Sequence, residues 1–187
     1  MDVEETRLRA LAKKASRGDE EAAALLFDEY YPRVYRYAAA RLGPGPSAED
    51  AASETFAKVV RELGRFKWRG AGFEGWLFRI ARNVIVDMQR RTGRETLTGE
   101  TIEPSETSRE GLPETAVVDV ESAAELRGLL ERLPPEQREV LLLRFGAGLD
   151  TNETGRAMEK NANAVRQLQL RALRNVRAML PEGVRGA

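Results

Sequence analysis

The chain has 187 residues, of which 42% are hydrophobic and 32% are charged, and its 30 basic and 30 acidic side chains cancel. It contains neither cysteine nor histidine. Their absence excludes disulfides, metal sites built from thiolates or imidazoles, and catalytic mechanisms that need a cysteine nucleophile or a histidine base. We therefore expect that the protein binds no metal and no cofactor and is not an enzyme. No run approaches the roughly 20 apolar residues of a membrane span and residues 1–20 are charged throughout, so we expect a cytoplasmic protein without a membrane span.

The first half of the chain shows the apolar periodicity of amphipathic helices, and no part of the sequence shows a strand pattern. A short helix over residues 6–15 is followed by Asp19, which can cap a second helix that Pro32 should kink or interrupt. Ser47 with Asp50 three residues later resembles a capping box and predicts the start of a third helix. The expected fold class is therefore all-α.

Aromatic and basic residues alternate in the loop over residues 65–72, and the helix that follows has one apolar stripe. Aromatic side chains beside Lys and Arg can stack unpaired bases and follow a phosphate backbone. In the alternative interpretation, which periodicity favours for Phe73 and Trp76, these aromatics belong to the core. Asn83 faces away from the stripe and could read a base edge, although an exposed helical asparagine is more often idle. The stripe consists of Phe73, Trp76, Leu77, Ile80, Val84 and Met88.

Charge divides the chain into unlike segments although its net charge is zero. Residues 61–94 carry nine basic and three acidic side chains, residues 95–125 carry one and nine, and residues 141–187 carry eight and four. Residues 92–120 also lack a sustained period and are rich in Gly, Pro, Ser, Thr and Glu, which predicts a flexible acidic linker between two small helical domains. Two basic segments favour two contacts with a polyanion, and ordinary solvated helix faces are the alternative.

Four helices are predicted in the second half, over about 121–133, 135–145, 150–158 and 162–180. Asp150 and Glu153 form a second pattern like a capping box, and Asn161 can cap the last helix. A turn of three residues joins the last two helices. This is the arrangement of a helix-turn-helix, which places its second helix in a DNA groove.

The exposed face of that last helix carries the side chains suited to DNA. Arg166 and Gln167 can pair with guanine and adenine at the major-groove edge, whereas Arg171 and Arg174 would meet phosphates. The alternative is that this face is unused, because short helix pairs with basic outer faces also occur in bundles that bind nothing.

Four stretches of the sequence carry motifs in a specific order and spacing. They are Arg17 to Glu20 with Phe27, Tyr30, Tyr31, Pro32 and Tyr35; Ala48 to Phe56; Phe73 with Trp76 to Asn83; and Leu133 to Val140 with Val165, Arg166 and Arg171 to Leu173. In this combination the chain resembles bacterial RNA polymerase sigma factors of the extracytoplasmic-function (ECF) class, within the sigma-70 family. The resemblance covers nearly all of the chain outside residues 92–120.

The resemblance implies a sigma factor that binds core RNA polymerase and directs promoter-specific transcription initiation. Residues 1–91 would form sigma domain 2, residues 92–120 the linker, and residues 121–187 sigma domain 4, which ends in the helix-turn-helix. Domain 2 would bind the β′ clamp of the polymerase and open the −10 element, while domain 4 would read the −35 element as duplex and rest on the β flap. Partners would be the core polymerase, promoter DNA and an anti-sigma factor.

The resemblance also implies roles for individual residues of this sequence. The predicted clamp-binding residues are Asp50, Ser53 and Glu54. The predicted −10 DNA-binding residues are Phe66, Lys67, Trp68, Arg69, Arg79, Arg82 and Asn83, which would surround a flipped base. The predicted −35 DNA-binding residues are Asn163, Arg166, Gln167, Arg171 and Arg174.

Some positions depart from the family pattern. Ser53 stands where the family usually has glutamine, and Thr154, Gly155 and Glu159 stand where it prefers an aliphatic residue, alanine and glycine. Gly155 costs a helix about 0.5–1 kcal/mol relative to alanine. We therefore expect the second domain to be less stable than is typical of the family.

Other classes of function stay open at this point. A two-domain regulator that acts without polymerase would bind duplex DNA tightly on its own. A structural helical adaptor would tolerate replacement of its outward-facing Arg166, Gln167 and Arg171. An enzyme is the remote alternative, since carboxylates such as Glu49 and Asp50 could act as acid and base but occupy no pocket that the sequence identifies.

Overall fold

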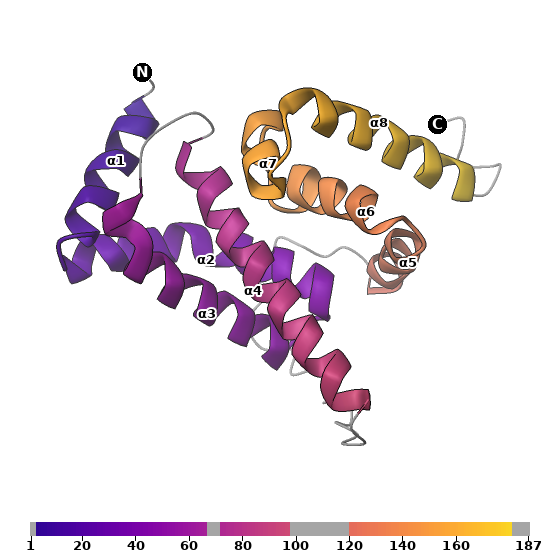
Figure 1. Cartoon of the computed structure of the whole chain (residues 1–187), viewed down its shortest axis with the longest axis horizontal. Helices are drawn as coiled ribbons and strands as arrows, with labels where there is room; N and C mark the ends of the chain where they lie inside the picture. Colours follow the sequence, from indigo (N-terminus) through magenta and orange to yellow (C-terminus); the bar gives the residue numbers. More distant parts are fainter. Residues whose placement is uncertain (1–2, 67–71, 98–119, 181–187) are drawn as a thin grey trace.

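The computed structural model describes residues 3–66, 72–97 and 120–180, and within these ranges every regular element is helical (Figure 1). Lobe 1 contains α1 (Val3–Ala15), α2 (Glu20–Leu42), α3 (Pro46–Glu62), the 3-10 turn η1 (Leu63–Arg65) and α4 (Gly72–Leu97). Lobe 2 contains α5 (Val120–Glu131), α6 (Pro135–Leu141), the π-helical turn η2 (Leu142–Gly146), α7 (Thr151–Met158) and α8 (Ala162–Met179). The prediction of an all-α fold with two helical domains is confirmed. No described helix is long and apolar enough to cross a membrane.

The start of α2 agrees with the sequence, but its middle does not. The Asp19 side chain accepts a hydrogen bond from the Ala22 backbone at 2.9 Å and caps the helix as predicted. Of the two predicted effects of Pro32, a kink or an interruption, the interruption does not occur, because α2 runs through Pro32 as one helix. Tyr30 and Val34, two residues away on either side, are buried in the core, and this packing holds the helix together despite the missing backbone donor.

Two predicted boundaries in lobe 1 are wrong. Ser47 does not cap α3, which begins with Pro46 at its first turn after Gly45, a residue with φ of 114°. Proline suits this position because its fixed φ is helical and its missing N–H would have no helical partner there. Further on, α4 continues to Leu97, beyond the predicted end at residue 91, because a single glycine at position 93 costs only about 1 kcal/mol. The rest of the predicted linker, residues 98–119, lies outside the described residues.

The predicted caps of lobe 2 are confirmed. Asp150 Oδ1 accepts from the Glu153 backbone and the Glu153 carboxylate accepts from the Asp150 backbone, both at 2.7 Å, so α7 opens with a complete capping box. Asn161 Oδ1 accepts from the Ala164 backbone at 2.8 Å and caps α8. These two local signals fix where the helix-turn-helix begins and turns.

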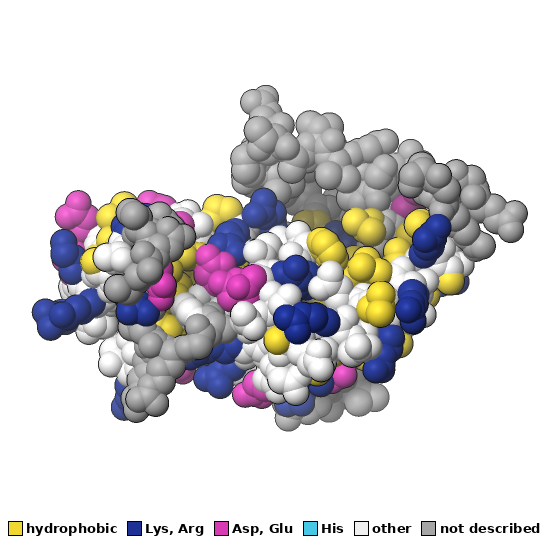
Figure 2. All heavy atoms as spheres, turned by 90° about the horizontal axis from the view of Figure 1, so that it is seen from above, with side chains coloured by type: hydrophobic (Ala, Val, Ile, Leu, Met, Phe, Trp, Pro, Cys, Tyr) yellow, Lys and Arg dark blue, Asp and Glu magenta, His cyan; other side chains and the backbone are white. Residues whose placement is uncertain are grey.

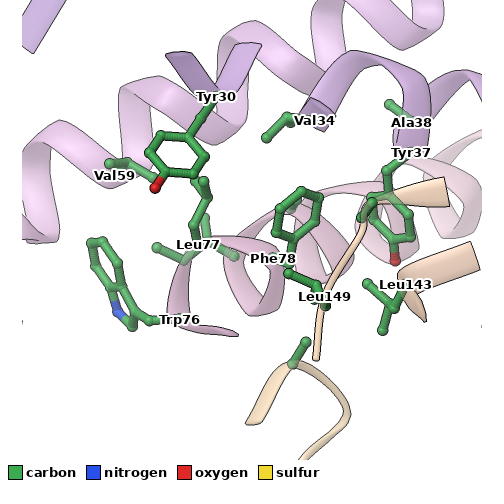
Figure 3. Packing of buried hydrophobic residues seen from close by; sticks show 14 of the residues in the cluster. Tyr30, Val34, Tyr37, Ala38, Val59, Trp76, Leu77, Phe78, Leu143 and Leu149 are labelled. Atoms are coloured by element: carbon green, nitrogen blue, oxygen red, sulfur yellow. The ribbon is translucent and has the colours of Figure 1, made fainter. Parts of the chain in front are cut away.

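The two lobes share one continuous hydrophobic core (Figure 3). Phe78 on α4 lies outside the predicted apolar stripe, yet it is fully buried because its ring faces lobe 2. It packs with Tyr37 of α2 at a ring-centre separation of 5.8 Å, and Leu143 and Leu149 of lobe 2 belong to the same cluster and are also fully buried. The lobes therefore meet through an apolar interface, which the helical periodicity of the sequence does not predict.

Thr154 occupies a position in α7 that suits an aliphatic side chain. It is fully buried, and its hydroxyl has no hydrogen-bond partner. An unpaired buried hydroxyl costs about 1–3 kcal/mol, so we expect Thr154→Val, which keeps the shape and removes the hydroxyl, to raise the free energy of unfolding by about 1 kcal/mol. Urea denaturation followed by circular dichroism measures this change, and an unchanged or lowered midpoint would contradict it.

Gly155 is needed by the turn, contrary to the view that it merely weakens α7. A Cβ at this position would lie 2.6 Å from the Lys160 carbonyl oxygen. The Lys160 backbone N–H in turn donates a hydrogen bond to the Gly155 carbonyl oxygen at 2.8 Å. We expect Gly155→Ala to lower the free energy of unfolding by about 1–3 kcal/mol, because backbone atoms of the turn must move to admit the methyl group. The same urea titration tests this, and a gain in stability would show that helix propensity outweighs the close contact.

Candidate nucleic-acid interface

The outer face of α8 carries the predicted −35 residues side by side. Val165 and Ala172 on its inner face are buried, and Asn175 donates to Gln137 of α6 at 2.7 Å, so packing fixes the rotation of the helix. Seen from above, basic side chains gather over α8 with hydrophobic ones among them (Figure 2). All five predicted residues are exposed, namely Asn163, Arg166, Gln167, Arg171 and Arg174. The geometry thus offers the groups that contact bases and phosphates on one accessible helix face.

Leu170 lies on this same face and was not among the predicted DNA-binding residues. It is 45% exposed, one turn beyond Arg166 and Gln167. An exposed apolar side chain beside base-reading residues is suited to contact a thymine methyl group. The signal was present in the sequence, because the spacing already placed Leu170 outward.

The predicted −10 residues on α4 lie at the edge of the lobe interface. Asn83 is exposed, whereas Arg79 and Arg82 are partly covered by lobe 2. Arg79 pairs with Glu159 at 3.4 Å, and Arg82 Nε lies 3.6 Å from a carboxylate oxygen of Glu139. In this arrangement the two guanidinium groups face carboxylates rather than solvent alone.

Phe66, the predicted stacking residue that the structure describes, rests on the aromatic core of lobe 1. Its ring centre lies 4.7 Å from that of Trp76 and 5.8 Å from that of Phe73, and both of these residues are buried. This confirms the interpretation of Phe73 and Trp76 as core residues. The Arg156 guanidinium of lobe 2 lies 5.5 Å from the Phe66 ring centre, within cation–π distance. Lys67, Trp68 and Arg69 lie outside the described residues.

Glu139 of α6 is the most deeply buried carboxylate at the interface, with 3% of its surface exposed. Tyr37 donates its hydroxyl hydrogen to one carboxylate oxygen, and Arg41 pairs with the other. Burial raises the pKa of Tyr37 to about 12, so the hydroxyl keeps its proton and remains a donor. Burial also lowers the pKa of Arg41, but an arginine remains charged at neutral pH. Lobe 1 therefore supplies Glu139 with a hydrogen-bond donor and two cations, Arg41 and Arg82.

Arg33 of α2 forms a second connection between the lobes. Its guanidinium donates to both oxygens of Glu74 at 2.9 and 2.6 Å and to the Ala147 carbonyl oxygen of lobe 2 at 3.0 and 2.8 Å. Burial by itself lowers the pKa of Arg33, but hydrogen bonding and charge attraction by Glu74 outweigh it and raise the pKa. Burial, followed by the charge of Glu74, raises the pKa of Tyr30, whose hydroxyl lies 3.4 Å from Glu74. Arg33 thus connects Glu74 of lobe 1 with the backbone of lobe 2.

The predicted clamp face lies on α3, at a distance from these lobe contacts. Asp50 and Ser53 are exposed, and Glu54 pairs with Lys58 at 3.0 Å. Val60, near the end of the same helix, is 55% exposed. On the neighbouring helix α2, Phe27 is 39% exposed and packs on Phe56 at 4.8 Å between ring centres. This end of lobe 1 therefore combines an acidic edge with an exposed apolar surface.

No group of carboxylates in the described ranges has the arrangement of a metal site. Two family models match the chain: sigma-70 region 2 over residues 26–95 and sigma-70 region 4 over residues 129–178. The two matches fall on lobe 1 and lobe 2, and the second contains the helix-turn-helix.

Curated relatives extend the similarity to almost the whole chain. The ECF RNA polymerase sigma factor BldN of Streptomyces coelicolor is 39% identical over 186 residues, which span 98% of this chain and 70% of the relative. The ECF RNA polymerase sigma factor SigD of Mycobacterium tuberculosis is 34% identical over 181 residues, 95% of this chain and 85% of the relative.

Solved structures share the fold. CnrH in complex with the cytosolic domain of CnrY matches with a TM-score of 0.69 at 23% identity, over 91% of this chain and 95% of that one. The sigma factor RpoE in complex with the anti-sigma factor NepR, from Bartonella quintana, matches with a TM-score of 0.62 at 20% identity, over 83% of this chain and 94% of that one.

Proposed function

Because the chain belongs to the ECF RNA polymerase sigma factors of the sigma-70 family, we propose that its two lobes divide the promoter between them, lobe 1 at the −10 element and lobe 2 at the −35 element. As a sigma factor it binds core RNA polymerase and directs promoter-specific transcription initiation. Sigma factors are initiation factors rather than enzymes, and we assign the chemistry of RNA synthesis to the polymerase, in the cytoplasm where that enzyme acts. On this view residues 1–91 act as sigma domain 2, residues 92–120 as the connecting linker and residues 121–187 as sigma domain 4.

The observation that carries the assignment of lobe 2 is the exposed face of α8. Its cap and buried inner face hold the helix rigidly, and its first two turns present Arg166 and Gln167 where a recognition helix contacts base edges. Arg171 and Arg174 follow on the same face and are placed to contact phosphates, with Asn163 near the start of the helix. We therefore assign these residues to the −35 duplex.

Lobe 1 is assigned to the −10 element through α4 and the loop before it. Opening a promoter exposes unpaired bases, and flipping one of them costs a few kcal/mol of stacking that an aromatic and hydrogen-bonding pocket can offset. Asn83 is exposed and has both a donor and an acceptor for a base edge, while Arg79 and Arg82 are suited to the phosphates beside it. Phe66 with Lys67, Trp68 and Arg69 would complete the pocket.

The contact with polymerase is assigned to two surfaces. Asp50, Ser53 and Glu54 on α3 would meet the β′ clamp, and the exposed Phe27 and Val60 add apolar area next to that acidic edge. Serine at position 53 has a shorter side chain than the glutamine usual in the family, so the apolar area would carry more of this contact. Lobe 2 would rest on the β flap.

An anti-sigma factor is a further partner that we assign to this chain. The RpoE structure that shares its fold was solved with the anti-sigma factor NepR, and the CnrH structure with the cytosolic domain of CnrY. The chain contains no cysteine, which excludes direct thiol sensing by its own side chains.

Transcription in vitro tests the proposed function. Core RNA polymerase is incubated with a library of genomic fragments, with and without the protein, and new RNA 5′ ends are mapped. We expect start sites that depend on the protein and share two upstream elements. A two-domain regulator would instead bind duplex DNA tightly without polymerase and add no start sites to core enzyme, and that outcome would refute the proposal.

A further inference from the structure

An arginine cluster, formed by Arg41, Arg82 and Arg138, surrounds one buried carboxylate where the lobes meet. Arg41 of α2 pairs with one oxygen of Glu139, and Arg82 Nε of α4 lies 3.6 Å from the other oxygen. Arg138 directly precedes Glu139 on α6 and lies close enough to lower the pKa of Arg41. The salt bridges of the described residues therefore give this cluster one negative charge for three positive ones.

The donors of the arginine cluster are not all used within the described part of the chain. Arg41 Nη2 donates to the Gln89 amide oxygen at 2.9 Å, but the buried Nε atoms of Arg41 and Arg138 have no hydrogen-bond partner among the described residues. The Arg82 Nε contact with Glu139, at 3.6 Å, is too long for a hydrogen bond. Only 9% of the Arg41 side chain is exposed, so bulk water does not replace the missing acceptor. Buried donors in this condition are costly unless an acceptor reaches them.

Repulsion between like charges makes the arginine cluster unfavourable by itself. Burial lowers the pKa of Arg41, and the charges of Arg138 and Arg82 act in the same direction. An arginine keeps its proton at neutral pH, so the loss of a proton does not relieve this repulsion. A second anion beside Glu139 would relieve it and would also supply acceptors to the unpaired donors.

Arg33, at the other connection between the lobes, has a different environment. Glu74 accepts from its guanidinium with both oxygens, and the Ala147 carbonyl oxygen accepts from its Nε and Nη2. In that place one carboxylate serves one arginine, whereas at Glu139 one carboxylate serves three. The excess of positive charge is therefore a property of the arginine cluster and not of the lobe interface in general.

We propose that the arginine cluster binds a phosphoryl group of a small molecule, in a site built by α2 and α4 of lobe 1 and α6 of lobe 2. A phosphoryl group carries a charge of about −1.5 to −2 at neutral pH, which matches the excess of positive charge, and its three oxygens suit guanidinium donors. The Arg82 side chain is 31% exposed and Arg138 is partly exposed, so both can be reached from solvent. Arg41 contributes its charge from the buried side. The site goes beyond the proposed promoter contacts and does not depend on them.

The test follows thermal unfolding of the full chain by calorimetry, in chloride buffer with and without pyrophosphate at equal ionic strength. Pyrophosphate at about ten times its Kd should raise the unfolding temperature by about 3–6 °C. Arg138→Gln, which removes the charge and keeps most of the length, should abolish this rise. In chloride alone the same substitution should raise the unfolding temperature, because it relieves the repulsion on Arg41. Arg132→Gln is the matched control, since Arg132 is an exposed arginine of the same lobe, and it should show the full rise.

Titration calorimetry gives a second readout and identifies the source of the phosphoryl group. Orthophosphate, pyrophosphate and a nucleoside triphosphate are titrated separately, and the unaltered chain and Arg132→Gln should bind one equivalent of at least one of them, whereas Arg138→Gln should bind none.

Three results would overturn the site. Phosphate ions also stabilise proteins by exclusion from their surface, so an equal rise of the unfolding temperature in the unaltered chain and in Arg138→Gln would mean that no site exists. A lower unfolding temperature of Arg138→Gln in chloride would show that an acidic side chain already pairs with Arg138. Weaker DNA binding by Arg138→Gln with unchanged pyrophosphate binding would assign this arginine to the DNA backbone instead.

Discussion

Replacing Arg166 by alanine is expected to weaken binding to the −35 duplex by about 1–3 kcal/mol, or roughly tenfold to a hundredfold, and to relax the preference for one base pair. Arg166 is exposed in the first turns of α8, directly after the buried Val165 that fixes the rotation of the helix. A guanidinium in this place can donate two hydrogen bonds to guanine, and alanine leaves both acceptors of that base unpaired. Binding to duplexes with single substitutions, measured on the full chain, reports the loss of preference.

Arg174 offers a matched control on the same helix face. It lies two turns further along α8, is also exposed, and is assigned to a phosphate. Arg174→Ala should weaken binding to all duplexes about equally and reduce the slope of log K against log salt by about 1. If both variants lost affinity uniformly across sequences, α8 would be a basic surface and would not read the −35 element.

Local signals in the sequence were sufficient for most of the helices. Asp19, Asp150 and Asn161 cap helices as predicted, because a cap depends only on a side chain and the backbone two or three residues later. Ser47 failed as a cap because Pro46, one residue earlier, already provides a first helical position. The exposed −35 face followed from periodicity alone, since α8 has one buried side.

Features that depend on contact between distant parts of the chain were not predictable in this way. Phe78 lies outside the stripe that serves lobe 1, and only the approach of lobe 2 explains its burial. Glu139 belongs to a charged stretch of the sequence, and nothing local indicates that Tyr37 and Arg41, about a hundred residues earlier, will surround it. Gly155 was misjudged for the same reason: its cost to the helix is local, whereas its benefit lies in the turn that folds back over it.

Replacing Gly75 by alanine is expected to destabilise the closed arrangement of the lobes, although alanine is the better helix former. A Cβ at Gly75 would lie 2.9 Å from the Glu153 carbonyl oxygen and 3.0 Å from Arg156 Cβ, both on α7. Relieving this overlap costs about 1–3 kcal/mol, which exceeds the roughly 0.5–1 kcal/mol that alanine adds to helix stability. Because one core spans both lobes, we expect a lower unfolding temperature by calorimetry and weaker energy transfer between dyes on the two lobes.

Gly128 of α5 separates the two contributions to this result. It too is a helical glycine, but nothing lies within 4 Å of a Cβ built there, so Gly128→Ala should raise the unfolding temperature by helix propensity alone. The pair of variants has the same chemistry and differs only in what the added methyl group meets. If Gly75→Ala stabilised the chain as much as Gly128→Ala, α4 and α7 would not be in contact in solution.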